Sequence, residues 1–400
     1  MDQVKAQYEA FPYPERNPKD EKKRLITGSP SIPMEIDHYL YEGRRDWSKP
    51  MRVLFAGGGT GDGLIQFAQM MTQAKRPYEI TYLDLSTAAH EIAEARAKIR
   101  GLDGIRFETG SLLDAASFGE FDYIDCCGVL HHLENPLDGF NALEAALAPE
   151  GGLGAMVYAP YGRAGVYALQ ESFNALFAGL PPDEKLKAAK QVYARLPDAH
   201  PFKANPHLVD HEQSDAGFYD LLLHSQDRAF DVGSLLDVMG QAGLRLLSFV
   251  PFGRYDLGRF VDAVSEDMSA AARMGLAEKL DGGIKTHVFY AARSAEPQRA
   301  VAASAAGQIP HLIGIGTEQL SLQIKKTGFV NLTVGGEKKK IDFQKSDASI
   351  VAGINGRRMV EEIAASSGLD GFLFQAGWAR IEAALKPWGL LCYSSILRGR

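Results

Sequence analysis

A glycine-rich loop carries the clearest chemical signal in this sequence. The stretch VLFAGGGTGDG, residues 53–63, begins as an apolar run and ends where a helical pattern starts. Glycine at such a turn lets the backbone bend sharply and approach a ligand without a Cβ in the way. The spacing is not the G-x-G-x-x-G of dinucleotide sites, since Asp62 and Leu64 stand where the third glycine would be. Asp62 also begins the helix at the place where a pyrophosphate would bind. The loop therefore favours a cofactor without phosphate groups over NAD.

One acid, Asp84, ends the next strand-like run, in YLDLS. In doubly wound nucleotide sites, an acid roughly twenty residues beyond the glycine loop binds the ribose hydroxyls. A carboxylate suits that role because it accepts hydrogen bonds from both hydroxyls of a diol. The alternative is that Asp84 caps the following helix, a role for which Ser86 and Thr87 are also available. We therefore expect Asp84 to bind ribose.

Two sets of histidines offer proton transfer or metal binding. His131 and His132 follow the fourth strand-like run, and we expect one of them to orient or deprotonate a substrate while the other bonds a backbone carbonyl. His200, His207 and His211 lie in a proline-containing stretch that does not favour the helix needed to place two of them on one face. No cysteine joins that stretch, and we expect no metal site.

The chain has three cysteines, Cys126, Cys127 and Cys392, which are too few for a disulfide framework. We therefore expect the cysteines to be reduced and the protein to be cytoplasmic. We expect Cys126 to be a small buried residue, and Cys127 with Gly128 to line a pocket at the end of a strand.

Composition sets the outer limits. The chain has 400 residues, of which 46% are hydrophobic and 23% charged, as in ordinary globular proteins of two or three domains. No run of about 18 apolar residues predicts a membrane span, and the first residues lack the apolar core of a signal peptide. The net charge of −7 argues against a protein that coats nucleic acid.

Residues 51–293 alternate between strand-like and helical patterns, which predicts βαβ units and a mostly parallel sheet that binds ligands at its carboxyl edge. A long irregular loop is expected at 197–215, and a helical insertion at about 161–230. The expected strands are 51–57, 79–85, 105–111, 121–128, 152–160, 244–252 and 286–293, and the expected helices are 62–72, 88–100, 137–148, 164–196, 230–242 and 265–280.

In this order and spacing, five motifs resemble the class I S-adenosylmethionine (SAM)-dependent methyltransferases. They are VLFAGGGTG for the SAM loop, YLDLS for the ribose acid, GSLLD (110–114) for the adenine-side turn, FDYIDCCGVLHHLENP (121–136) for the fourth strand and its exit, and LAPEGGL for the entry to the fifth strand. The opening QYEAFPYPERNP and AGFYDLLLHSQDRAF (216–230) resemble segments of a bacterial subgroup of these enzymes. The resemblance covers roughly residues 1–293.

The resemblance implies an α/β, doubly wound, mostly parallel seven-stranded Rossmann-like sheet with its last strand antiparallel. It implies SAM as cofactor and S-adenosylhomocysteine as product. The acid usual at the end of the first strand is missing at Phe55 and Ala56, so Asp62 is the candidate for the SAM amino group, and Ser111 stands where an acid often meets the adenine. The cofactor-binding residues implied are Ala56, Gly57, Gly59, Gly61, Asp62, Asp84, Leu85, Ser111, Leu112, Cys127 and Gly128.

The acceptor side is expected to be aromatic. Residues 1–50 are predicted to fold over SAM as a lid, with Tyr8 and Phe11 either facing the pocket or packing the lid to the core. The residues predicted to shape the substrate pocket are Tyr13, Tyr158, Tyr161 and His224, and those predicted to be catalytic are His131 and His132.

The last hundred residues have a separate character. They carry 12 Lys and Arg against 8 Asp and Glu, a balance of +4 that leaves −11 for the first 300. VNLTV and KKKIDF flank Gly335-Gly336 and predict a hairpin, followed by helices at 359–366 and 373–385 and a last strand in LLCYSSIL. The lysines of the hairpin are read as a solvated edge rather than a nucleic-acid patch. The arrangement is loosely winged-helix-like.

These patterns predict a lid segment (1–50), a methyltransferase domain (51–293), a linker (294–309) and an α+β accessory domain (310–400) for protein docking or homodimerisation. The predicted function is methyl transfer from SAM by in-line displacement to a protein side chain or a small molecule, with no nucleic-acid or membrane partner expected. The alternatives are a non-catalytic protein that binds SAM or S-adenosylhomocysteine and, less favoured because the glycine loop is intact, a scaffold without a ligand.

Overall fold

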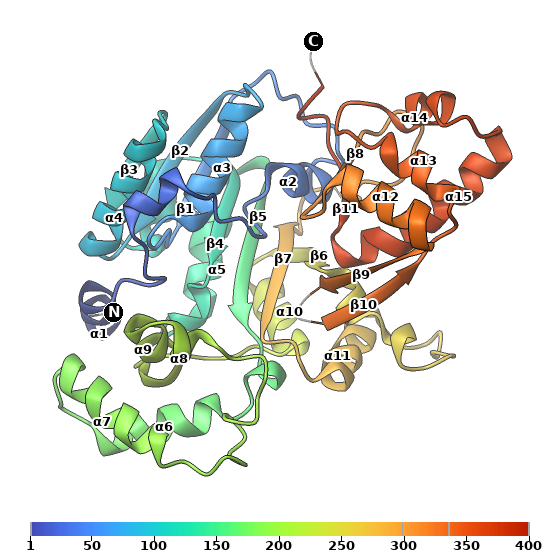
Figure 1. Ribbon diagram of the computed structural model, residues 1–400. Coiled ribbons are helices and arrows are strands. Elements are labelled where there is room, and N and C mark those ends of the chain that lie inside the picture. Colours follow the sequence, from blue (N-terminus) through green and yellow to red (C-terminus); the bar gives the residue numbers. More distant parts are fainter. Residues whose placement is uncertain (1, 298, 335–336, 399–400) are drawn as a thin grey trace.

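Seven strands form one sheet within the first 293 residues (Figure 1), in the order β3-β2-β1-β4-β5-β7-β6. The computed structural model describes residues 2–297, 299–334 and 337–398. β1 to β5 run parallel, and β7 lies antiparallel between β5 and β6. The predicted Rossmann-like sheet is thus confirmed, including its antiparallel last strand. The strands are β1 (Met51–Ala56), β2 (Tyr78–Asp84), β3 (Ile105–Thr109), β4 (Phe121–Cys127), β5 (Leu147–Tyr158), β6 (Leu244–Val250) and β7 (Thr286–Arg293).

Helices cover both faces of this sheet. One face packs against α2 (Pro33–Leu40), α3 (Asp62–Gln73) and α4 (Thr87–Arg100). The other packs against the 3₁₀ turn η2 (Leu112–Phe118), α5 (Pro136–Ala145) and α10 (Val232–Gln241), with α11 (Ala270–Asp281) beside α10. The side chain of Asp231 caps α10 by accepting a hydrogen bond from the backbone amide of Ser234.

Several predicted boundaries differ from the structure. The helix predicted at 137–148 ends at Ala145, and β5 begins at Leu147 rather than at 152. The pairing of β4 with β5 shifts between Phe121 and Tyr123, so residues 148–151 form an irregular start to the strand. The third strand ends at Thr109 rather than 111, because the side chain of Ser111 caps the turn η2.

The segment after β5 is helical, as predicted, and has its own core. That core includes Phe173, Leu186, Phe202 and Leu222. The predicted loop 197–215 holds one short helix and buries Phe202, so it is more ordered than its prolines suggested. The helices are α6 (Val166–Leu176), α7 (Pro182–Ala194), α8 (Asp210–Gln213) and α9 (Asp215–Leu223), preceded by η4 (Tyr161–Arg163).

The chain ends in a second lobe beside the sheet, drawn in orange and red (Figure 1), with a separate apolar core. The predicted hairpin is present, although its turn at Gly335-Gly336 lies outside the described residues. Two helices, α12 and α13, were not predicted. The elements are β8 (Pro310–Leu312), α12 (Thr317–Thr327), β9 (Phe329–Val334), β10 (Glu337–Asp342), α13 (Asp347–Ala352), α14 (Val360–Ser366), α15 (Gly371–Leu385), η7 (Lys386–Trp388) and β11 (Leu391–Tyr393).

The two lobes meet at a buried carboxylate, Asp37, on α2. Asp37 accepts hydrogen bonds from the Ser394 hydroxyl at 2.7 Å, the Ser395 amide at 3.1 Å and the Trp47 indole at 3.0 Å. The segment 294–309 also contacts α2, since the Ala302 amide bonds to a carbonyl of α2. The described part of this predicted linker contains no helix.

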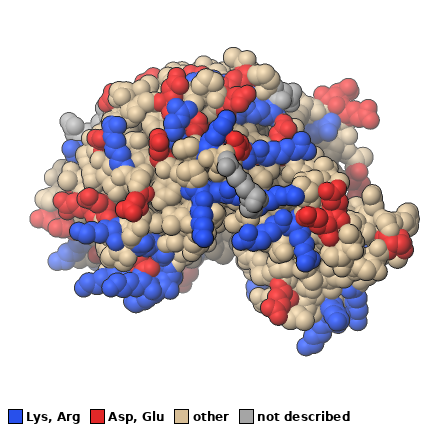
Figure 2. Space-filling model, turned by 90° about the horizontal axis from the view of Figure 1, so that it is seen from above, with Lys and Arg blue, Asp and Glu red and all other residues tan. Residues whose placement is uncertain are grey.

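Charges of both signs are mixed on the face seen in Figure 2. Lys and Arg gather near its middle, with Asp and Glu among and around them. Near the end of the described chain, Arg76 and Arg357 donate hydrogen bonds to the carbonyls of Ile396 and Leu397. This face is therefore not the one-signed surface typical of nucleic-acid binding. No helix in the described residues is long and apolar enough to cross a membrane.

Candidate active site

The glycine loop between β1 and α3 is fixed by close packing. Gly57, Gly59 and Gly61 have φ angles of 71°, 51° and 96°, a conformation that favours glycine. A Cβ on Gly57 would lie 2.4 Å from a methyl of Val129, and one on the neighbouring glycine at 58 would lie 2.5 Å from the ring of Tyr82. The loop therefore presents bare backbone at the carboxyl edge of the sheet.

Asp84 holds this loop from the end of β2. Its Oδ2 accepts a hydrogen bond from the Gly59 amide at 2.8 Å, and its Oδ1 accepts one from the Ser86 amide at 2.8 Å. The cap of α4 is the Ser86 side chain, so the alternative role of Asp84 as that cap is not observed. Burial raises the pKa of Asp84. Each carboxylate oxygen can accept a second hydrogen bond, so the residue fits the ribose of SAM.

Asp62 is held by arginines of the chain itself. Arg16 donates to it from Nε at 2.9 Å and from Nη2 at 2.6 Å, and Arg96 donates from Nη1 at 2.7 Å. Although burial raises the pKa of Asp62, the hydrogen bonds and charges of Arg16 and Arg96 hold it below its usual value. Two cations already neutralise this carboxylate, which weakens the prediction that it binds the amino group of SAM.

The N-terminal segment lies directly on the glycine loop. The Thr60 hydroxyl donates to the carbonyl of Pro14 at 2.7 Å, and a Cβ on Gly59 would lie 3.2 Å from the carbonyl of Tyr13. The helix α1 (Asp2–Ala10) continues to the start of α4, where Glu9 accepts a hydrogen bond from the Thr87 amide at 2.6 Å. The N-terminal segment thus contacts the loop and α4, and its role as a lid stays a prediction.

The two predicted catalytic histidines, on the turn η3 (Leu130–His132), differ in their surroundings. The Nδ1 of His132 lies 3.0 Å from the carbonyl of Gln226. Because a carbonyl only accepts, Nδ1 carries the proton and Nε2 keeps a lone pair. His131 is fully buried against the ring of Tyr158, at 3.8 Å between centroids, and neither of its nitrogens has a partner in the described chain. Burial lowers the pKa of His131. Of the two histidines, His132 alone has a hydrogen bond that fixes its ring among the described residues.

A buried acid that sequence analysis did not single out, Asp220 on α9, faces this histidine. It accepts hydrogen bonds from the hydroxyls of Tyr8 at 3.0 Å and Tyr158 at 3.1 Å. Ligand atoms of His132, Asp220 and His224 all lie within 4.8 Å of one another, and the rings of the two histidines stack at 3.8 Å. Burial raises the pKa of Asp220. Its spacing of four from His224 on one helical stretch was the available sequence signal.

The predicted pocket residues are only partly brought together. Tyr158 and His224 belong to the Asp220 cluster. Burial raises the pKa of Tyr13, and the charge of Asp220 raises it further. Tyr161 begins the turn η4. The roles of Tyr13 and Tyr161 in the acceptor pocket stay predictions.

The other predicted cofactor residues lie at the carboxyl ends of β1, β2, β3 and β4. Ala56 is buried at the end of β1, whereas Cys127 is exposed at the end of β4 beside Gly128, whose φ is 84°. Ser111 and Leu112 begin the turn η2, and Leu85 follows Asp84 directly. Cys126 is buried, as predicted.

Metal binding at this cluster is disfavoured by its hydrogen bonds. The Nδ1 of His224 accepts from the Gln226 amide at 3.1 Å, so the proton lies on Nε2, the nitrogen that faces Tyr8 at 3.3 Å. A protonated nitrogen has no lone pair for a metal. His131, His132 and Asp227 also lie close together, but Asp227 pairs with Arg163 at 3.1 Å.

The histidines of the proline-containing stretch serve other contacts. The Nδ1 of His200 accepts from the Phe202 amide at 3.1 Å, and the Nε2 of His211 lies 2.9 Å from the Tyr193 hydroxyl. Among the described residues, neither group that could hold a metal ion includes them. The absence of a metal stays a prediction.

A glycine loop after β1, an acid at the end of β2 and a cluster of buried polar side chains beyond β4, all at the carboxyl edge of this sheet, are typical of a class I methyltransferase. A family model described as a methyltransferase domain matches residues 54–153. A protein of Synechococcus sp., described only as uncharacterised, is 31% identical over 318 residues, which are 74% of this chain and 72% of the relative.

Solved structures agree in fold. PKMT2 from Rickettsia typhi superposes with a TM-score of 0.62 at 14% identity, over 93% of this chain and 77% of that one. The same protein in complex with AdoHcy gives a TM-score of 0.61 at 15% identity, with the same coverage. The chain therefore contains a methyltransferase domain at residues 54–153 and shares the fold of these solved structures.

Proposed function

We propose that this protein transfers the methyl group of SAM to an amine nitrogen, carried by a protein side chain or by a small molecule. The observation that supports this acceptor is Asp220. It is 4% exposed, and among the described residues the groups that act on its charge are His132, Tyr8, Tyr158 and Asp227, with no Lys or Arg. A buried carboxylate is costly unless it is paired, and an alkylammonium group is the ligand that supplies the missing charge.

The surroundings of Asp220 suit an ammonium group. The hydroxyls of Tyr8 and Tyr158 hold its two oxygens in place, and aromatic rings of the kind that attract cations form the walls. Oxygen and sulfur acceptors arrive uncharged or negative, so they would leave the carboxylate unpaired or repel it.

Proton transfer falls to His132. An ammonium group must lose a proton before its nitrogen can attack, and the Nε2 lone pair of His132 accepts that proton. When bound, SAM supplies a methyl group whose bond to the sulfonium sulfur breaks as the nitrogen lone pair forms the new bond. The carboxylate of Asp220 then stabilises the positive charge on the methylated nitrogen. Burial excludes water, so positioning provides much of the rate.

The cofactor side is assigned to the backbone of the glycine loop and to Asp84, which would accept the ribose hydroxyls. Gly57 and Gly59 allow that close approach, and Cys127 lines the floor at the end of β4. We also propose that residues 1–50 act as a lid and that 310–400 form an accessory domain. A cytoplasmic location and a homodimer through 310–400 stay predictions.

The substitution Asp220→Asn tests the acceptor assignment. It keeps the size of the side chain and removes its charge, so we expect methylation of amines to fall by about 100-fold or more while calorimetric affinity for SAM stays unchanged. Asp215→Asn is the matched control, since Asp215 lies on the same helix, is exposed and pairs with Lys190. Amine methylation at the wild-type rate in Asp220→Asn would remove the residue from the site.

A protein that binds SAM without turnover is the other function considered. The free lone pair on His132 and the buried acid beside it favour catalysis over sensing. Transfer of a labelled methyl group to any acceptor separates the two functions.

A further inference from the structure

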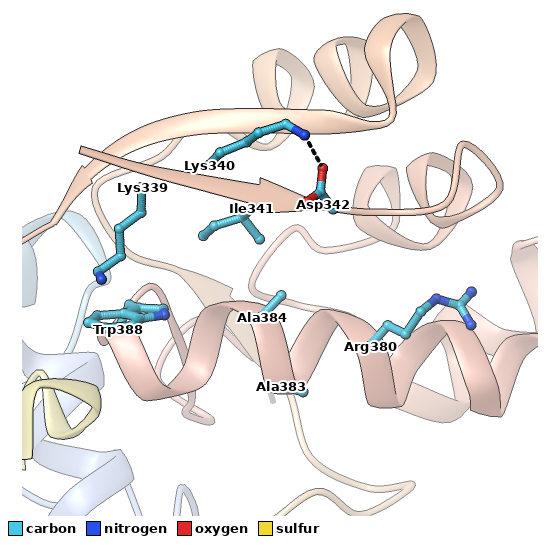
Figure 3. Close-up of a pocket in the computed structure, with 8 residues that line it drawn as sticks. All are labelled: Lys339, Lys340, Ile341, Asp342, Arg380, Ala383, Ala384 and Trp388. Carbon is cyan, nitrogen blue, oxygen red and sulfur yellow. Dashed lines mark ion pairs between the residues drawn. The ribbon is translucent and has the colours of Figure 1, made fainter. Parts of the chain in front are cut away.

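A groove of about 600 Å³ opens in the C-terminal lobe between β10 and α15 (Figure 3). None of its lining residues belongs to the Asp220 cluster or to the glycine loop. The residues that line it are Lys339, Lys340, Ile341, Asp342, Arg380, Ala383, Ala384 and Trp388.

The side chains on the floor of the groove are apolar and mostly small. Ala383 and Ala384 contribute only methyl groups from α15, with Ala384 pointing toward Ile341 on β10, and the ring of Trp388 lies on the helix side of the groove, below Lys339 (Figure 3). Small side chains let a neighbouring backbone lie close to a helix. The floor thus suits an extended chain with apolar side chains better than a bulky rigid ligand.

The rim of the groove is positively charged. Lys339 lies over the ring of Trp388, with its Nζ 4.0 Å from the centroid. Lys340 pairs with Asp342 at 2.8 Å, which is the one acid among the lining residues. Arg380 lies further along α15 and contacts Asp347, a buried acid. With Asp342 paired to Lys340 and Asp347 to Arg380, these three cations and two acids leave a net charge of one positive unit at the rim.

The strand β10 also offers an edge. In the described sheets it pairs only with β9, in a two-stranded ribbon. The second edge of such a strand carries backbone donors and acceptors that an extended peptide can pair with, while pockets beside it select the side chains.

We propose that this groove binds an acidic, extended segment of a partner protein, added as a strand beside β10. Acidic side chains of the segment would meet Lys339, Lys340 and Arg380, and apolar ones would lie against Ile341 and Trp388. This assigns the C-terminal lobe a docking role that is independent of the chemistry at Asp220.

Two other occupants fit the groove less well. A second copy that added its own β10 would place Lys338, Lys339 and Lys340 against the same lysines, and like charges across strands are destabilising. Nucleic acid would meet few cations here on a chain whose net charge is −7, whereas its binders usually present an extensive basic surface.

The test uses the full-length chain and fluorescence anisotropy of labelled eight-residue peptides that alternate glutamate and valine, or lysine and valine. We expect the glutamate peptide to bind more tightly and its affinity to fall with added salt. Charge reversal in the double variant Lys339→Glu, Lys340→Glu should weaken binding about 10-fold or more. The control is Lys325→Glu, Lys326→Glu on α12, where two exposed lysines lie off the groove.

A third variant, Ala384→Glu, keeps the test decisive if circular dichroism shows that changes in β10 disturb the hairpin. It places a negative charge on the floor without altering the strand, and it should also weaken binding of the glutamate peptide. Equal affinity for both peptides, or equal loss in the α12 control, would overturn the proposal. So would a single-stranded oligonucleotide that binds more tightly than the peptide with the same dependence on Lys339 and Lys340, or dimerisation through the groove that the peptide does not compete with.

Discussion

The cofactor half and the acceptor half of the active site are held in different ways. The cofactor half consists mainly of backbone, namely a loop whose glycines are packed against Val129 and Tyr82 and tied to Asp84. The acceptor half consists of side chains that come from α1, η3, the end of β5 and α9 and meet at Asp220. The cofactor half should therefore tolerate changes of charge but not changes of shape. The acceptor half should tolerate small changes of shape but not changes of charge.

The largest effect is expected from His132→Gln, which removes the ring nitrogen that accepts the proton. Loss of a positioned general base lowers kcat by about 10²–10⁴-fold, and affinity for SAM should not change. His131→Phe is the paired variant. It replaces a buried ring with unpaired nitrogens by an apolar ring, so turnover should persist and stability should hold or rise. Steady-state kinetics on both variants measures the two values of kcat. Equal losses of kcat in the two variants would mean that the histidines act only through packing.

Shape is tested by Gly57→Ala. The added Cβ would lie 2.4 Å from Val129 and would need a φ of 71°. We expect calorimetry to show a loss of SAM affinity of about 100-fold, which corresponds to about 3 kcal/mol. Gly101→Ala separates strain from crowding, because Gly101 has a φ of 64° with no atom within 4 Å of the added Cβ. If both variants bind SAM like the wild type, packing of the loop is not what shapes the cofactor half.

Another buried carboxylate, Glu35, lies outside the acceptor half and can be compared with Asp220. Glu35 accepts a hydrogen bond from the Tyr290 hydroxyl at 3.2 Å, and burial raises its pKa to about 7. Since the folded state holds this proton more tightly than the unfolded state, its stabilising contribution is complete below pH 4.5 and is lost as the pH rises through 7.

Denaturant unfolding at pH 5 and pH 8 should therefore differ by up to about 3 kcal/mol from this group alone. Glu35→Gln should remove that difference, and Glu171→Gln, an exposed change on α6, should keep it. An unchanged pH dependence in Glu35→Gln would assign it to other groups. Adding an amine acceptor should change the contribution of Asp220 to the free energy of unfolding. It should not change the contribution of Glu35.

The smallest effect is expected from Tyr8→Phe, which deletes one hydrogen bond to Asp220 and leaves the ring. Such a bond contributes about 1.5–3 kcal/mol when its acceptor is charged, so kcat/KM for the acceptor should fall by roughly 10-fold, with SAM affinity unchanged. Tyr41→Phe, on a tyrosine that bonds a backbone carbonyl far from this cluster, is the control. An effect on SAM affinity instead would place α1 over the cofactor rather than over the acceptor.

The sheet and its cofactor edge were predictable because their signals are local. Asp84 is recognised from the strand that it ends, and the glycine loop from consecutive residues. Asp220 was not, because its meaning depends on Tyr8 and Tyr158, which lie 212 and 62 positions away in the chain. Sequence patterns also did not indicate that the charge of Asp62 is paired, because its partner Arg16 belongs to the N-terminal segment.

The C-terminal lobe shows where local patterns fail. Its hairpin and its last two helices follow from turn glycines and apolar spacing. α12 was missed because only Leu320 and Ile324 of its residues are buried, so its apolar stripe is narrow. The groove beside β10 lies between elements about forty residues apart in the sequence, and no single stretch indicates it.

The most direct test of the account is transfer of labelled methyl from SAM by the wild-type protein to two matched peptides, one with free lysine amines and one with the same lysines acetylated. Mass spectrometry of the products locates the added methyl group. The account predicts methylated nitrogen in the free peptide and none in the acetylated one, with the transfer lost in Asp220→Asn. Equal labelling of both peptides, or methyl groups found on oxygen or sulfur while lysines stay unmodified, would contradict it.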